Sequence, residues 1–345
     1  MFDNLKNKAY FFVDRIERLY FSKKDIAEGY FLYGEKKAYF TDARYFSDAV
    51  RYFKNTDITP ILYNGLETIK DYLIKEGILE LITDFDKINV STYNFLSSVV
   101  KVIDGKKILS LAREIKSDKE LLYIKKACKI VQKAYYSAIK EVKLGITEIE
   151  LKDILEKYMF KFGADEIGFE TIVAFGAGSA VPHHVTGKTK LKLNSPILID
   201  AGAKYKGYIS DITRVAFFGK PDRKFTKIYN SVLRANLTAE EKIFSGITTS
   251  DADKIARDSL KEDGLDSYFT HSLGHGVGLE VHEAPTLSKK ANTLLKDGCV
   301  FTIEPGVYLD NLYGVRIEDT VVLEKGRVKR LFTDNKKLLI IKDKS

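Results

Sequence analysis

The sequence of 345 residues contains no tryptophan, and cysteine and proline are scarce. Its two cysteines, Cys128 and Cys299, are too few to form a disulfide framework in a chain of this length, so we expect a reducing compartment. With only 6 prolines and 23 glycines, collagen-like and low-complexity classes are excluded. Hydrophobic residues make up 45%, which predicts a soluble globular protein of about two domains.

Long apolar runs are also missing, and none reaches the roughly 18 residues of a membrane span. The N-terminal sequence carries charges every few residues and lacks the apolar core of an export signal. We therefore expect a cytoplasmic protein with no membrane partner. The net charge of +8 is spread along the chain and alternates with acids, so we expect no nucleic-acid partner either.

Two regions of different character divide the chain. The first reads as a small α/β domain, with the strand-like runs GYFLYG and KAYFTDA. After it, Ser117 with Glu120 and Thr147 with Glu150 form capping boxes, each opening a predicted helix. We therefore predict an α+β chain with domains at residues 1–115 and 116–345.

The second region contains a faint internal repeat. GITEIELKDILEKYM from Gly145 is echoed by GITTSDADKIARDSL from Gly246, and each copy is followed by Gly-x-Asp. Two similarly built halves that pack face to face would place a site on their pseudo-twofold axis.

The histidines are confined to one part of the chain. All 5 lie within about 100 residues, which favours a shared role. They are His183, His184, His271, His275 and His282. The His-x-x-x-His spacing of the third and fourth resembles a helical zinc motif, but the glycines between and after them make a helix improbable.

Pairs of carboxylates accompany these histidines on predicted hairpins. A two-residue turn at Tyr205 and Lys206 would make Asp200 and Asp211 direct cross-strand partners on one face. Facing carboxylates repel one another unless a cation lies between them. The pair therefore predicts a metal bridge.

A second predicted hairpin also carries a pair of carboxylates. Glu304 and Glu318 are equidistant from Asn311, and Arg316 shares a strand face with Glu318. Four carboxylates with imidazole and without thiolate would balance two divalent cations, with Mn²⁺, Co²⁺ or Fe²⁺ favoured over structural zinc. Such a pair of ions activates water, so we predict hydrolysis of an amide or a phosphoester.

Five blocks together resemble the creatinase/aminopeptidase P/prolidase family of metallopeptidases. They are PHH at Pro182, IDAGAKYKGYISDITR, HSLGHGVGLEVHE, TIEPGVY and GVRIEDTV, in the family's order. The resemblance implies a C-terminal pita-bread catalytic domain with an internal pseudo-twofold repeat. It also implies a smaller α/β creatinase-like N-terminal domain.

The resemblance further implies the roles of individual residues. The metal ligands would be Asp200, Asp211, His275, Glu304 and Glu318. The catalytic residues would be His183, His282 and Glu304, and the substrate would contact His183, His271, His282 and Arg316. His184 departs from the family pattern and is assigned no role.

The implied reaction is hydrolysis of the Xaa-Pro bond at the N-terminus of a peptide, through a hydroxide that bridges two Mn²⁺ ions, with Co²⁺, Zn²⁺ and Fe²⁺ as alternative metals. We expect an Xaa-Pro aminopeptidase acting on peptides with proline at the second position, and by resemblance a homodimer. The alternatives are an Xaa-Pro dipeptidase (prolidase), a methionine aminopeptidase and a non-catalytic peptide-binding pita-bread module.

Overall fold

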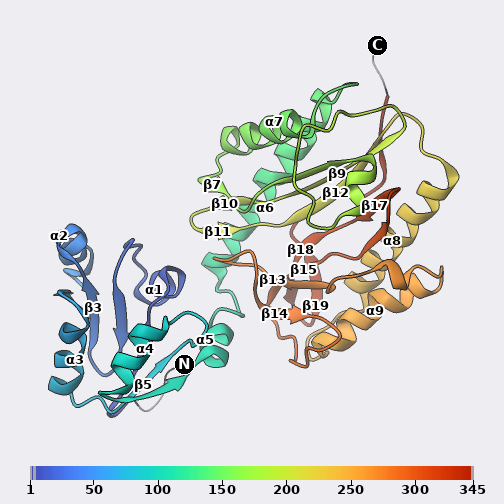
Figure 1. Ribbon diagram of the computed structural model, residues 1–345. Coiled ribbons are helices and arrows are strands. Elements are labelled where there is room, and N and C mark those ends of the chain that lie inside the picture. The colour runs from blue at the N-terminus through green and yellow to red at the C-terminus, as the bar shows by residue number, and fades with distance from the viewer. Residues whose placement is uncertain (1, 3–4, 343–345) are drawn as a thin grey trace. The chain divides into compact units, whose positions relative to one another are not determined.

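The structure is a computed structural model that describes Phe2 and residues 5–342. The chain divides into two compact units, Met1–Ala112 and Arg113–Ser345 (Figure 1). Each unit has buried apolar clusters of its own. Among the described helices, none combines the length and apolar character needed to cross a bilayer.

The N-terminal unit is built on one mixed sheet with the strand order β4-β3-β2-β1-β5-β6. Phe11 and Phe12 belong to different apolar clusters, because successive side chains of a strand point to opposite faces. The strand-like runs GYFLYG and KAYFTDA form β2 and β3, which are antiparallel neighbours. The elements are β1 (Lys8–Phe12), α1 (Arg15–Ser22), β2 (Tyr30–Tyr33), β3 (Lys37–Thr41), α2 (Ala43–Phe53), β4 (Ile58–Leu62), α3 (Leu66–Lys75), β5 (Glu80–Thr83), α4 (Val90–Ser97), β6 (Lys101–Asp104) and α5 (Lys106–Ala112).

In the C-terminal unit, helices flank a core of strands (Figure 1). Its helices are α6 (Asp118–Ala138), α7 (Glu148–Lys161), α8 (Arg223–Lys242) and α9 (Thr249–Lys261), with short 3₁₀ turns η1 (Ile139–Glu141), η2 (Gly176–Ala180) and η3 (Asp266–Tyr268). Both predicted capping boxes are present, at Ser117 with Glu120 and at Thr147 with Glu150.

The strands of this unit form several sheets. One sheet has the order β20-β12-β9-β8 and another the order β14-β13-β15-β18-β19, while β11-β10-β7 and β16-β17 form smaller ones. The strands are β7 (Glu166–Ile167), β8 (Ile172–Phe175), β9 (Ser195–Ala201), β10 (Ala203–Tyr205), β11 (Tyr208–Ile209), β12 (Ile212–Phe218), β13 (Gly274–Gly276), β14 (Glu283–Leu287), β15 (Val300–Ile303), β16 (Gly306–Leu309), β17 (Tyr313–Arg316), β18 (Asp319–Glu324), β19 (Arg327–Arg330) and β20 (Leu339–Ile341).

The internal repeat is visible in matching contacts before α7 and α9. The N–H of Gly145 donates to the carbonyl of Leu191 at 3.0 Å, and the N–H of Gly246 donates to that of Leu295 at 2.7 Å. Two apolar clusters follow the same division, one packing α6 and α7 against β9 and β12, the other packing α8 and α9 against β15 and β18. The two halves therefore share one plan.

Candidate metal centre

The first pair of carboxylates lies on β9 and just before β12. The turn between β10 and β11 falls at Lys206 and Gly207, which have φ values of 51° and 85°. The predicted centre was one residue too early, because positive φ at both central residues favours a turn that includes this glycine. The register pairs Asp200 with Thr213, so the predicted direct pairing of Asp200 with Asp211 is wrong. Asp211 is instead the diagonal neighbour, two residues before Thr213.

The second pair follows the predicted hairpin register. Ile303 pairs with Asp319 on one side of the glutamates, and Gly306 pairs with Arg316 on the other. Glu304 and Glu318 therefore lie opposite each other between the two ladders. Their N–H groups donate elsewhere, to the carbonyls of Leu273 at 2.8 Å and Thr213 at 3.1 Å respectively, so the two side chains share one face.

His275 lies on the strand β13. The prediction that this segment does not form a helix is therefore confirmed. A Cβ at Gly274 would come within 1.9 Å of the carbonyl oxygen of Thr302, so glycine permits this close approach to β15. His275 Nδ1 lies 3.1 Å from the carbonyl of Gly276, and Nε2 lies 3.3 Å from Glu304 Oε1. Its second nitrogen therefore faces the carboxylates.

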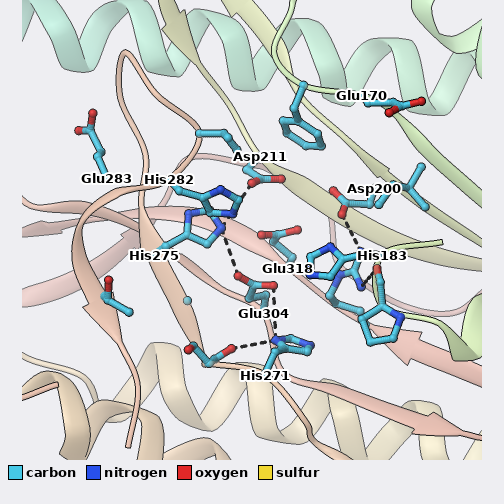
Figure 2. A pocket seen from close by; sticks show the side chains of 18 residues that line it. Glu170, His183, Asp200, Asp211, His271, His275, His282, Glu283, Glu304 and Glu318 are labelled. Atoms are coloured by element: carbon cyan, nitrogen blue, oxygen red, sulfur yellow. Dashed lines mark hydrogen bonds and ion pairs between the residues drawn. The ribbon is translucent and has the colours of Figure 1, made fainter. Parts of the chain in front are cut away.

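One pocket of about 590 Å³ collects these side chains (Figure 2). An oxygen each from Asp211 and Glu318 and a ring nitrogen of His275 lie within 4.8 Å of one another. The other two predicted ligands line the same pocket with additional partners. Asp200 Oδ2 accepts from Arg316 Nη2 at 2.6 Å, and Glu304 pairs with His275.

Burial and like charge dominate the electrostatics of this cluster. Burial raises the pKa of Asp211 and of Glu318 well above the usual values, and neighbouring carboxylates raise both further. Burial acts in the opposite sense on His275, but the hydrogen bond and charge of Glu304 outweigh it and raise the pKa of this imidazole to about 9. Burial would also raise the pKa of Glu304, yet His275 lowers it to about 2.

The donor set fits divalent cations. Among the described residues, Asp200 Oδ1 and Asp211 Oδ1 are buried oxygens without a hydrogen-bond partner. Buried carboxylate oxygens of this kind are costly unless a cation satisfies them. Carboxylates with one imidazole are ligands that Mn²⁺, Co²⁺, Fe²⁺ and Zn²⁺ accept.

Arg316 lies beside the carboxylates and is almost fully buried. Its guanidinium donates to Thr213 Oγ1 and Tyr308 Oη, both at 2.9 Å, as well as to Asp200. Tyr308 Oη also lies 2.8 Å from His271 Nε2. Tyr308 was missed because it sits in an apolar strand with no polar residue beside it, and only the fold reveals its partners.

The remaining predicted histidines take different positions. His183 and His282 line the pocket, and the His282 ring centroid lies 4.2 Å from that of His275. His184 is outside the pocket lining, and its Nε2 lies 3.0 Å from Oε2 of the buried Glu148. This carboxylate also accepts from the Phe175 N–H at 2.9 Å, so His184 has a structural environment.

Comparisons with known proteins identify the family. Residues 123–325 match the model of metallopeptidase family M24. The chain is 40% identical over 294 residues to an Xaa-Pro dipeptidase of Pyrococcus furiosus, covering 84% of this chain and 80% of that protein.

Solved structures resemble nearly the whole chain. An X-Pro aminopeptidase from Thermotoga maritima matches with a TM-score of 0.88 and 32% identity, covering 97% of both chains. An Xaa-Pro dipeptidase from Bacillus anthracis matches with a TM-score of 0.92 and 33% identity, covering 96% of this chain and 95% of that one. The predicted pita-bread fold with a preceding N-terminal domain is thereby confirmed. The chain belongs to metallopeptidase family M24.

Proposed function

We propose that this metallopeptidase hydrolyses the Xaa-Pro bond at the N-terminus of short peptides, with Xaa-Pro dipeptides as its main substrates. The observation that carries the proposal is the convergence of the four predicted carboxylate ligands and four histidines on one pocket. The likeness to the Pyrococcus dipeptidase supports the choice of dipeptides. The Thermotoga neighbour supports Xaa-Pro aminopeptidase as the second candidate.

Metal ions would be held by the five predicted ligands, Asp200, Asp211, His275, Glu304 and Glu318. When bound, two divalent cations would supply an activated water nucleophile and balance the charge of the four carboxylates. Arg316 keeps Asp200 oriented through its bond to Oδ2.

The chain's own residues would manage the charge and the proton. His183 and His282 face the pocket and would donate hydrogen bonds to the scissile carbonyl oxygen as it gains negative charge. The proline nitrogen carries no hydrogen in the peptide, so it needs a proton before it leaves. Glu304 lines the pocket and would accept a proton from water and pass it to that nitrogen.

Apolar side chains line the same pocket and offer a surface for the proline ring. Phe169, Ile172 and Val281 lie among the lining residues, beside the carboxylates. A proline ring that contacts these side chains would be removed from water. The contact would also hold the tertiary amide near the catalytic groups.

The proposal also names the setting of the reaction. Mn²⁺ is the expected ion because the ligands are mainly oxygens. A cytoplasmic location agrees with the two cysteines, which are both free thiols. A homodimer and a creatinase-like domain at residues 1–115 complete the proposal, on the resemblance described above.

A substrate panel tests this proposal. The protein is stripped with chelator, restored with Mn²⁺, Co²⁺ or Zn²⁺, and assayed on an Xaa-Pro dipeptide, an Xaa-Pro-Xaa tripeptide and a Met-Ala peptide. We expect metal-dependent cleavage of proline substrates, with a higher kcat/KM for the dipeptide. A preference for the tripeptide would identify an aminopeptidase, and cleavage of Met-Ala alone would contradict the proposal.

A further inference from the structure

Asn236 lies on α8, fully buried, and contacts both strands that carry the glutamate ligands. Its Nδ2 donates to the carbonyl oxygen of Ile303 at 2.8 Å and to that of Ile317 at 3.1 Å. Each carbonyl belongs to the residue immediately before a glutamate, Glu304 or Glu318. The Asn236 amide therefore links the two backbone segments directly before Glu304 and Glu318.

Pro305 explains why the strands need this donor. The register on either side places Pro305 opposite Ile317, and the Ile317 N–H donates to the Pro305 carbonyl at 3.3 Å. An antiparallel pair of this kind normally exchanges two hydrogen bonds. Proline has no N–H, so the return bond to the Ile317 carbonyl cannot form. Asn236 Nδ2 supplies the missing donor.

Lys336 fixes the orientation of this amide. Its Nζ donates to Asn236 Oδ1, and also lies 2.8 Å from both Glu240 Oε1 and Asp319 Oδ2. The amide oxygen of Asn236 and the carboxylate of Glu240 accept hydrogen bonds from this ammonium group, and Asp319 forms an ion pair with it. Because a cation faces Oδ1, the amide must turn its Nδ2 toward the two carbonyls.

The backbone at Lys336 is itself held in place. Lys336 has a φ of 54°, in the left-handed region that residues other than glycine rarely adopt. Tyr229 on α8 donates its Oη to the Lys336 carbonyl at 2.9 Å. Lys336 is also only 2% exposed. Burial together with this backbone conformation indicates that the surrounding structure determines the conformation of the segment.

We propose that Asn236 is a positioning residue for Glu304 and Glu318, and that Lys336 holds Asn236 in the productive orientation. The inference rests on the proposed function, because the spacing of the two glutamates matters only if they bind ions. Asn236 touches neither the pocket nor a ligand side chain in the contacts described, and acts through the backbone of residues 303–305 and 317–318.

Asn236→Leu tests the proposal, because leucine has a similar volume and no hydrogen-bonding group. Isothermal titration of the metal-stripped full chain with Mn²⁺ should show affinity reduced by about 10–100-fold, the usual effect of losing a group that orients ligands. Excess Mn²⁺ should restore most of kcat, and KM for an Xaa-Pro dipeptide should stay within about twofold.

Ser231→Ala is the matched control. Ser231 is also a buried polar residue of α8, but its Oγ donates to the Lys227 carbonyl at 3.0 Å and contacts Asp263, and neither partner belongs to the segments that carry Glu304 and Glu318. This variant should lose thermal stability and keep the Mn²⁺ affinity of the wild type.

The outcomes separate the two levels of the proposal. If wild-type protein binds Mn²⁺ and Asn236→Leu binds it equally well, the positioning role is overturned while the proposed function stands. If the wild type binds no Mn²⁺, both are overturned. Should Asn236→Leu fail to fold, Tyr229→Phe decides, because it removes only the hydroxyl that holds Lys336. A two- to fivefold loss of affinity then supports the role, and unchanged affinity overturns it.

Discussion

Asp211→Asn should make the metal-free protein more stable and the metal-loaded protein inactive. Asp211 is buried, its pKa is raised well above the usual value by burial and then by the charge of Glu318 and Asp200, and its Oδ1 lacks a hydrogen-bond partner within the described residues. We therefore expect the free energy of unfolding in chelator to rise by about 1–2 kcal/mol. At roughly 2–4 °C per kcal/mol, Tm should rise by about 2–8 °C.

The assay is thermal unfolding with EDTA and with Mn²⁺. In EDTA, the Tm difference between Asp211→Asn and the wild type should shrink as pH falls toward about 4. Below the pKa of the unfolded chain, the carboxyl is protonated in both states and no longer lowers the stability of the wild type. With Mn²⁺, the wild type should gain stability and the variant should gain much less, while its activity falls by more than about three orders of magnitude.

Asp253→Asn provides the contrast for this experiment. Asp253 is a buried carboxylate too, but it accepts from Arg257 Nε at 2.6 Å and from the Leu273 N–H at 3.0 Å. Its neutralisation should lower Tm with and without Mn²⁺. A lower Tm of Asp211→Asn in EDTA, or equal Mn²⁺ stabilisation of variant and wild type, would refute the account of the cluster.

Three further substitutions separate the roles of neighbouring residues. His282→Ala should lower kcat by about 10²–10³-fold and retain Mn²⁺, since it removes a donor to the developing charge; loss of bound metal in equilibrium dialysis would contradict this. Arg316→Lys should weaken Mn²⁺ binding by about 10-fold, because a single ammonium cannot reproduce the contacts to Asp200 and its neighbours; an unchanged titration would contradict it. His184→Ala should lower the free energy of unfolding by about 1–3 kcal/mol through loss of a partner of buried Glu148, with kcat unchanged; a large loss of kcat at full folding would assign His184 a role in catalysis.

Much of the site could be predicted from the sequence because its residues lie close to turns. Glu304 and Glu318 flank a hairpin centred on Asn311, whose φ is 60°, and their symmetric spacing is confirmed by the register. The predicted partner of Asp200 was wrong by two positions, because the turn lies one residue later than predicted. Tyr205–Lys206 and Lys206–Gly207 are both short turns in sequence, and only the positive φ of Gly207 distinguishes them.

The supporting residues could not be predicted in the same way. Asn236 contacts carbonyls 67 and 81 positions away, and Lys336 reaches it from 100 positions away. No local spacing encodes contacts of this kind. One signal was present, since Asn236 follows Val232 by one helical turn on the buried face of α8, where an amide requires a partner.

The most direct test of the central claim is a titration of metal-stripped protein with Mn²⁺, followed through hydrolysis of an Xaa-Pro dipeptide. We predict no hydrolysis before Mn²⁺ is added, and a rate that levels off near two equivalents of bound metal. Full hydrolysis in the presence of chelator, or activity that is independent of bound metal, would contradict the account.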